Sequence, residues 1–165
     1  MLKLFKLAAV IVALGVPSGA FAQAQVAFGG LKHDSSLPIE IAADQLSVDQ
    51  ADGSAVFNGN VKIGQGDMRL SAGKVRVEYT TGAGTTGEIS KLFASGGVTL
   101  INGAEAAEAR DATYTISSGT VVMTGSVILT QGQNALSSDK LIVNLTSGTG
   151  TMEGRVKSII QTGGN

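Results

Sequence analysis

The sequence predicts an all-β fold, a jellyroll or solenoid in which antiparallel strand pairs stack around one continuous inner face. Apolar residues alternate with polar residues over most of the chain, and no window keeps a helical period over three turns. Glycine occurs 23 times, proline twice and tryptophan never, which is typical of short strands joined by tight turns. In addition, one long segment of the sequence occurs twice.

The alternating segments predict the individual strands in chain order. Their apolar members are Ile39 and Ile41, Leu46 and Val48, Val61 and Ile63, Val75, Val77 and Tyr79, Val98 and Leu100, Tyr114 and Ile116, and Leu141, Val143 and Leu145. Side chains two positions apart point to the same face of a strand, so each segment has one apolar face and one mixed face. We therefore expect strands that are buried on one side.

The repeat predicts how these strands are organised. Residues 56–79 align without a gap on residues 122–145. The identical positions in the first copy are Gly59, Val61, Gln65, Gly66, Leu70, Ser71, Lys74 and Val77. Further Gly-x-Val units begin at Gly96 and Gly154, and a longer spacing after Gly59 is explained by the insertion at 80–88. One unit cannot bury its apolar face alone, so the units are expected to stack.

The first residues carry the features of a signal peptide. Lys3 and Lys6 precede an apolar run from Leu7 to Val16, and Ala20-Phe21-Ala22 forms a cleavage site. The run is too short to cross a bilayer, although an uncleaved N-terminal anchor is the alternative. We predict a signal peptide over 1–22, a flexible lead-in over 23–37, the β-jellyroll domain over 38–160 and a C-terminal tail over 161–165.

Charge and composition exclude several classes of function. The chain has 12 basic and 13 acidic side chains, and without Lys3 and Lys6 the formal charge becomes −3, which argues against nucleic acid as a partner. The chain has no cysteine, so no disulfide can stabilise it in an oxidising compartment.

The sequence contains no convincing catalytic or metal-binding pattern. The Gly-x-Gly-x-x-Gly match at 82–87 lacks a following helix and is better interpreted as a hairpin insertion. His33, the single histidine, lies in the predicted lead-in, where we expect it to be solvated. The carboxylates form two loose groups without the pattern of a calcium loop: Asp44, Asp49 and Asp52, and Glu105, Glu108 and Asp111. We predict no cofactor, no metal site and no enzymatic activity.

The apolar faces leave two interpretations open. They consist mainly of Ile, Val, Leu and Ala, with few aromatic rings to fill the interior. Such faces can enclose a lengthwise groove, and burying each methylene group of an acyl chain there contributes about 0.8 kcal/mol. The same residues can equally form an ordinary dry core.

The ordered motifs resemble the OstA-like lipopolysaccharide-transport proteins of the periplasm. The similarity covers roughly residues 37–158 and rests on the entry strand Pro38-Ile39-Glu40-Ile41, then Phe57-Asn58-Gly59-Asn60-Val61, Gln65-Gly66 and Ala72-x-Lys74-Val75. The resemblance implies an open, twisted β-jellyroll, a solenoid-like stack of antiparallel strand pairs. The protein would then be a periplasmic bridge that carries lipopolysaccharide acyl chains in an apolar groove, as the resemblance implies. It also implies head-to-tail self-association and contacts with inner-membrane-anchored and outer-membrane OstA-like partner proteins.

The resemblance also implies a set of lipid-binding residues. It assigns lipid contact to Ile39 and Ile41, to Leu100, and to Tyr114 and Ile116, and the inward face of the repeated strand adds Val61 and Ile63.

Two alternatives to the bridge stay open. One is a structural, self-assembling β-solenoid with a solid core, such as a filament or adhesin module. The other is the membrane-anchored OstA-like partner of the same pathway, which would keep residues 1–22 as an anchor.

Overall fold

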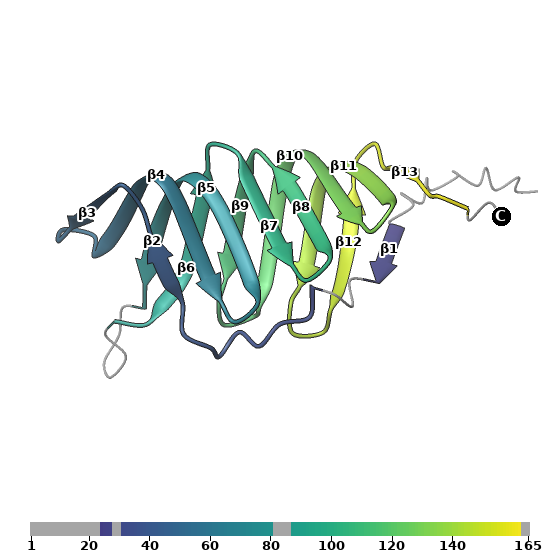
Figure 1. The fold of residues 1–165 in the computed structure, drawn as a ribbon. Helices are drawn as coiled ribbons and strands as arrows, with labels where there is room; N and C mark the ends of the chain where they lie inside the picture. Colours follow the sequence, from purple (N-terminus) through teal and green to yellow (C-terminus); the bar gives the residue numbers. More distant parts are fainter. Residues whose placement is uncertain (1–23, 28–30, 81–86, 163–165) are drawn as a thin grey trace, which may run out of the picture.

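The computed structural model describes residues 24–27, 31–80 and 87–162, so the predicted signal peptide and most of the 82–87 motif lie outside the described residues. These ranges form strands joined into one 13-stranded sheet, without an α-helix among them, which confirms the all-β prediction (Figure 1). The strands are β1 (Ala24–Ala27), β2 (Glu40–Ala42), β3 (Gln45–Asp49), β4 (Ser54–Gln65), β5 (Met68–Tyr79), β6 (Ile89–Ser95), β7 (Val98–Asn102), β8 (Glu105–Ala109), β9 (Asp111–Thr115), β10 (Thr120–Gln131), β11 (Asn134–Asn144), β12 (Thr149–Glu153) and β13 (Lys157–Ile159).

The sequence repeat is a repeat of structure. The long hairpin β4–β5 recurs as β10–β11, and Ser54 and Gln65, which bound β4, correspond to Thr120 and Gln131, which bound β10. Each hairpin closes with a tight turn whose glycine, Gly66 or Gly132, has positive φ. That conformation costs glycine little, because glycine has no Cβ to clash with the following carbonyl.

A β-bulge bends each long hairpin at its middle. In β4, Gly59 and Asn60 both have positive φ, and the pairing with β5 shifts register between Asn58 and Val61. The same geometry recurs at Gly125 and at the glycines that begin the two weaker units. A bulge of this kind increases the local twist and turns the strand. We call the line of bends at Gly59, Gly96, Gly125 and Gly154 the corner.

The corner folds the sheet into two layers that face each other. The first layer contains β3, the first half of β4, the second half of β5, then β6, β9, the first half of β10, the second half of β11, β12 and β1. The second layer contains β2, the remaining halves of the long strands, β7, β8 and β13. The two layers are joined at the corner and separate at the opposite side, which we call the mouth.

Apolar rows cross both layers and form the interior. The second-layer row follows paired positions from strand to strand: Ile41, Ile63, Leu70, Leu100, Ala107, Leu129, Leu136 and Ser158. The first-layer row is Val48, Ala55, Val77, Leu92, Tyr114, Val121, Val143 and Gly150. Most of these side chains belong to one continuous buried cluster, so the repeat builds a single interior, as its stacking predicted.

Part of the predicted lead-in contacts the jellyroll. Strand β1 pairs with β12, and residues 31–38 run along the mouth to β2 at the other end of the molecule (Figure 1). Leu31 is fully buried, and His33 is 9% exposed and donates its backbone N–H to Leu145 O at 2.7 Å. His33 is therefore buried, and the expectation that it is solvated was wrong, because tertiary packing supplies partners that a non-periodic sequence does not reveal.

Candidate functional site

The structure places three of the predicted lipid-binding residues in one row. Ile41, Ile63 and Leu100 belong to the second-layer row, and Leu70 lies between the last two. Val61 lies on the same inner face, one step closer to the corner, and is fully buried. The four predicted residues, Ile41, Val61, Ile63 and Leu100, therefore face the interior from the same layer. In the sequence, 59 positions separate Ile41 from Leu100.

Tyr114 approaches this row from the opposite layer. It lies on β9 in the first-layer row, and its hydroxyl donates a hydrogen bond to Gln65 Oε1 at 3.0 Å. Burial raises the pKa of Tyr114 to about 12, since the phenolate would lose its hydration. Ile116 lies beyond the end of β9, near the mouth, and is partly buried against the core. The bond from Tyr114 to Gln65 therefore ties the two layers together.

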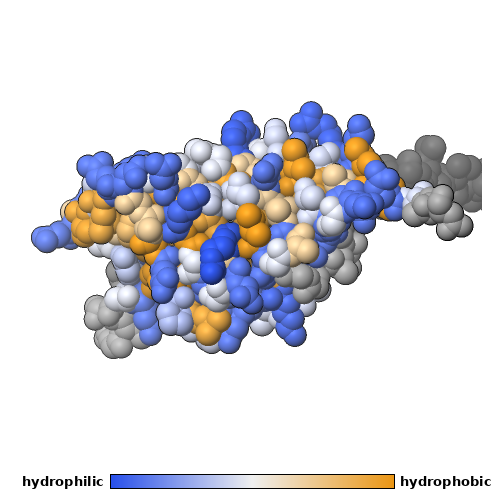
Figure 2. Space-filling view, viewed as in Figure 1, coloured by the Kyte–Doolittle hydropathy of each residue, from blue (hydrophilic) through white to orange (hydrophobic). Residues whose placement is uncertain are grey.

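The N-terminal end of the molecule is the most open part of the apolar interior. Ile39 and Ile41 are partly buried there, while Leu46 and Val48 of β3 are 54% and 64% exposed. Figure 2 shows apolar surface gathered at this end, over β3 and β4. A cavity of about 730 Å³ lies beside β2 and β4, and its lining includes Ile41 and Ile63. Apolar side chains are thus accessible where the rows end.

Between the two ends of the molecule the interior is closed in this structure. Leu100 is fully buried, and Ile63 and Tyr114 are each about 1% exposed. Sequence reasoning left a groove and a dry core open, and the described residues pack as a core between the two layers. An acyl chain that enters from the open end must therefore displace side-chain contacts or separate the layers.

The first group of acidic residues that was considered for metal binding stabilises turns and a bend. Asp44 accepts a hydrogen bond from Asn60 Nδ2 at 2.8 Å, beside the bulge in β4. Asp49 and Asp52 accept backbone N–H groups two residues further along, in the turn between β3 and β4. Among the described residues, no group of three His, Cys, Asp or Glu side chains is placed to hold a metal ion.

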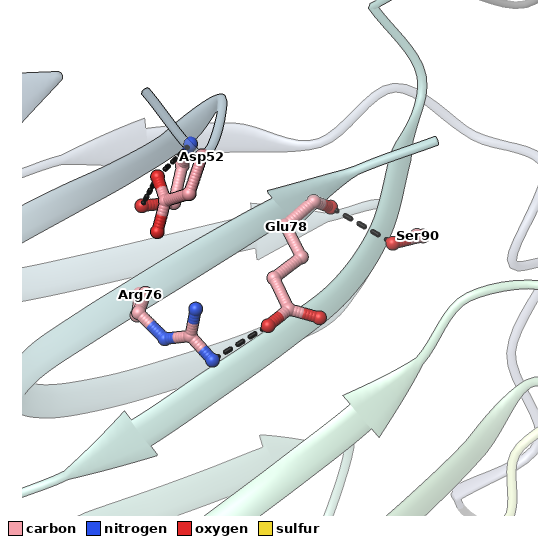
Figure 3. A network of polar contacts seen from close by, with 5 residues as sticks. Asp52, Arg76, Glu78 and Ser90 are labelled. Carbon is pink, nitrogen blue, oxygen red and sulfur yellow. Dashed lines mark hydrogen bonds and ion pairs between the residues drawn. The ribbon is translucent and has the colours of Figure 1, made fainter. Parts of the chain in front are cut away.

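The outer face of the first layer is polar and solvated. Arg76 forms an ion pair with Glu78 on the same strand (Figure 3). The hydroxyl of Ser90 donates a hydrogen bond to the backbone oxygen of Glu78. The Arg76 guanidinium also lies 4.8 Å from the ring centroid of Phe93 on β6. Both members of the ion pair are more than one-third exposed, so it contributes little to stability. This face shows the polar surface expected of strands that are buried on one side.

Sequence reasoning missed a set of polar side chains along the mouth. Gln65 and Asn102 are almost completely buried there, at the ends of β4 and β7. Glu105 follows at the start of β8 and accepts a hydrogen bond from Gln131 Nε2 at 3.1 Å. The signal that could have found them is the Gln-Gly pair, which occurs at the same place in both copies of the repeat.

The sequence of residues 40–149 matches the family described as LptA/(LptD N-terminal domain) LPS transport protein. The chain belongs to this family. The match covers the second layer's entry strand β2 and continues to the start of β12, so it includes both copies of the long hairpin. The match confirms the family resemblance inferred from the sequence. Because the family consists of transport proteins, the match also confirms the prediction that the chain is not an enzyme.

Two comparisons extend this result. The chain is 30% identical over 168 residues to an uncharacterized protein of Rhizobium meliloti (strain 1021), a match that covers 93% of this chain and 90% of the relative. Its fold is similar to the crystal structure of LptH, the LptA-homologous periplasmic component of the lipopolysaccharide transport device of Pseudomonas aeruginosa. The TM-score is 0.68 at 18% identity, over 78% of this chain and 99% of that chain. In the described part of this chain, no helix has the length and apolar character needed to span a membrane.

Proposed function

We propose that this protein carries lipopolysaccharide through the periplasm, with the acyl chains between the two layers, and that it bridges an inner-membrane export complex and an outer-membrane translocon. The observation that carries the proposal is the pair of apolar rows, which cross every repeat from β2 to the C-terminal strands. Family membership and the periplasmic relative LptH support the same role.

The mechanism is passive. Along most of the second-layer row the side chains are aliphatic, so an acyl chain can move past them without breaking specific polar contacts. Each methylene group that leaves water contributes about 0.8 kcal/mol, and this contribution is nearly the same at every position along the rows. A nearly uniform interior holds the lipid without trapping it at one point. The energy for directional movement comes from other components.

Head-to-tail association supplies the length that a bridge needs. The strands β2 and β3 form one end of the molecule and β13 ends the second layer at the other (Figure 1). All residues of β3 and β13 are exposed, and unpaired strand edges add further strands readily. Pairing of β13 with the β2 end of a second copy would continue the second-layer row. OstA-like partners at the two membranes would use the same edges.

A self-assembling β-solenoid with a solid core is the competing function, and the closed packing around Leu100 favours it. Both functions predict strand addition at the ends, but only the carrier takes up lipid. The membrane-anchored OstA-like relative would share the carrier chemistry and differ in retaining residues 1–22.

A photo-crosslinking residue at Ile41, compared with one at Lys62, tests the carrier. Ile41 lies in the second-layer row, whereas Lys62 precedes Ile63 and points to the outer face, where its Nζ donates to Ser71 Oγ at 3.3 Å. In cells, we expect lipopolysaccharide adducts at position 41 and none at position 62. Protein adducts alone, or lipid at neither position, would favour the solid-cored assembly.

As a second variant, Ile41→Asp places a charge in the row and is expected to weaken lipid capture.

A further inference from the structure

The mouth of the molecule is covered by residues 31–38, which we call the strap. It leads from the side of β12 to the start of β2, along the open side of the two layers (Figure 1). At one end, His33 donates its backbone N–H to Leu145 O in the first layer. At the other end, the strap hydrogen-bonds to Gln65 in the second layer. It therefore bridges the two free sides of the jellyroll.

Two amide side chains of the second layer hold the strap by its backbone carbonyls. Gln65 Nε2 donates to Ser35 O at 2.9 Å and to Leu37 O at 2.8 Å. Asn102 Nδ2 is 3.4 Å from Lys32 O. Gln65 and Asn102 are 1% and 4% exposed, so their donors need a partner in every state of the protein, because a buried donor without a hydrogen bond is destabilising.

The strap also fills the mouth with side chains, but its attachment is uneven. Leu31 is fully buried, and the buried Nε2 atom of His33 has no hydrogen-bond partner among the described residues. In contrast, Asp34, Ser36 and Leu37 are exposed, and Asp34 forms a local turn by accepting the backbone N–H of Ser36. A segment with few buried side chains and one unsatisfied buried atom opens at a lower free-energy cost than the strands beneath it.

Gly66 creates the space that the strap occupies. A Cβ atom at this position would lie 2.7 Å from Leu37 Cδ1 and 3.1 Å from His33 Cε1. At Gly132, the equivalent position of the second copy, a Cβ atom would meet nothing within 4 Å. The strap therefore packs closely on the turn of the first copy alone.

We propose that the strap is a removable occupant of a lipid site at the mouth, and that Gln65 and Asn102 bind acyl carbonyl groups once it leaves. The proposal rests on the carrier function. Lipopolysaccharide acyl chains are attached through ester and amide carbonyls, which are the same kind of acceptor that Ser35, Leu37 and Lys32 present. Displacement then exchanges one set of carbonyl acceptors for another, while an acyl chain takes the place of Leu31 in the apolar interior.

A reversible cross-link tests whether the strap must move. Because the chain has no cysteine, the double variant Leu37→Cys/Gly66→Cys carries a single thiol pair. A Cβ atom at position 66 would lie 2.7 Å from Leu37 Cδ1, which places position 66 beside the Leu37 side chain. We expect its oxidised form to capture fluorescent lipopolysaccharide about tenfold or more weakly than its reduced form, since closure removes the competent state. The reduced form of the same molecule is the control for any strain at Gly66. Equal capture in both forms would overturn the strap proposal and leave the carrier function standing.

Loss of capture by the unmodified chain would instead overturn the carrier function, and the strap proposal with it. Hydrogen exchange gives a second readout in that unmodified chain. We expect lipopolysaccharide to speed exchange at the His33 amide, which now bonds Leu145 O, and to leave the amides of β10 protected. Unchanged protection of His33 at saturating lipid would contradict displacement.

Gln65→Met, with Gln131→Met as the matched control, tests the carbonyl contacts. Both substitutions keep side-chain length, and Gln131 occupies the same turn of the second copy but bonds Glu105. For Gln65→Met we expect faster lipid capture, because the strap is released, and faster lipid loss, because a carbonyl donor is gone. For Gln131→Met we expect neither change. Faster capture without faster loss would overturn the role of Gln65 in the lipid site.

Discussion

The two copies of the long hairpin share their local structure and differ in what surrounds them. Strands β4–β5 and β10–β11 have corresponding lengths, and each contains a bulge and a glycine turn with positive φ. In the first copy, Gln65 donates a hydrogen bond to the strap and accepts one from the hydroxyl of Tyr114. In the second, Gln131 bonds Glu105 of the neighbouring strand. The comparison shows that one sequence pattern can serve as a structural turn and, in another setting, as part of a candidate binding site.

The bends in the two copies share a backbone hydrogen bond and differ in the side chain that lies beside it. The carbonyl of Gly59 accepts the backbone N–H of Asp44, and that of Gly125 accepts the backbone N–H of Arg110. The backbone interaction is therefore the same, while the side chain beside the bend is acidic in one copy and basic in the other. The bend depends on backbone geometry, and the side chain next to it is free to vary.

The largest expected effect compares Leu70→Ala with Leu136→Ala. Leu70 is 2% exposed in the middle of the second-layer row, whereas the equivalent Leu136 is only partly buried near the C-terminal end. Leu70→Ala is expected to lower the free energy of unfolding by about 2–5 kcal/mol, because it leaves a cavity. Leu136→Ala is expected to cost clearly less. Denaturant unfolding measures both, and equal losses would mean that the middle and the C-terminal end of the row are packed alike.

The next effect concerns Tyr114, which interacts with the first copy. Its pKa is raised by burial from 10.0 to about 12. The stabilisation that this shift represents is complete below pH 10 and is lost as pH rises through about 12, because the unfolded chain releases its proton first. A shift of this size corresponds to about 2–3 kcal/mol. Unfolding measured against pH should show this alkaline loss, and Tyr114→Phe should remove it.

Gly66→Ala and Gly132→Ala separate the strap from the turn. Both glycines have positive φ, at 54° and 59°, so both substitutions carry the same backbone cost of about 1–2 kcal/mol. Only the Cβ at position 66 would collide with the strap. We expect a similar loss of stability in both variants, with faster exchange of the His33 amide in Gly66→Ala alone. Faster exchange in both variants would show that the turns, and not the strap, control that amide.

The smallest expected effect is at the last bend. Hydrogen bonds from Arg155 hold the pKa of Asp139 below its usual value of 3.8. The resulting stabilisation is present above that value and is lost as pH falls through the lowered pKa. It is small because Arg155 is largely exposed. Asp139→Asn should flatten a slight acid-side decrease in stability, and a large loss at neutral pH would indicate a role in shaping the bend that the ion pair does not explain.

Much of the fold was predictable from the sequence. Period-two alternation located β2, β3, β4, β5, β7, β9 and β11 but not β1, β6, β8 or β12. The gapless repeat gave corresponding bounds for β4 and β10. The glycines at the bends were identified as repeat positions, but the bulges were not predicted. A bulge depends on the pairing between two strands, and neither strand contains that information alone.

The candidate site was predictable only in part. Alternation selected residues that do face the interior, including Ile63 and Leu100. The strap was not predictable, because Leu31 and His33 lie in a short segment without periodicity. The strap is held by residues that are distant in sequence: His33 bonds Leu145, and Ser35 bonds Gln65.

The all-β class, the repeating unit and the apolar face of each strand follow from local spacing in the sequence and from the geometry of an extended chain. Three features required the folded structure: the bends align into one corner, Tyr114 reaches Gln65 across the interior, and residues 31–38 cover the mouth. These features depend on which distant residues meet when the strands pair. The physical reason is that burial and hydrogen bonding reward long-range contacts, whereas a local pattern specifies only which side of a strand is available to make them.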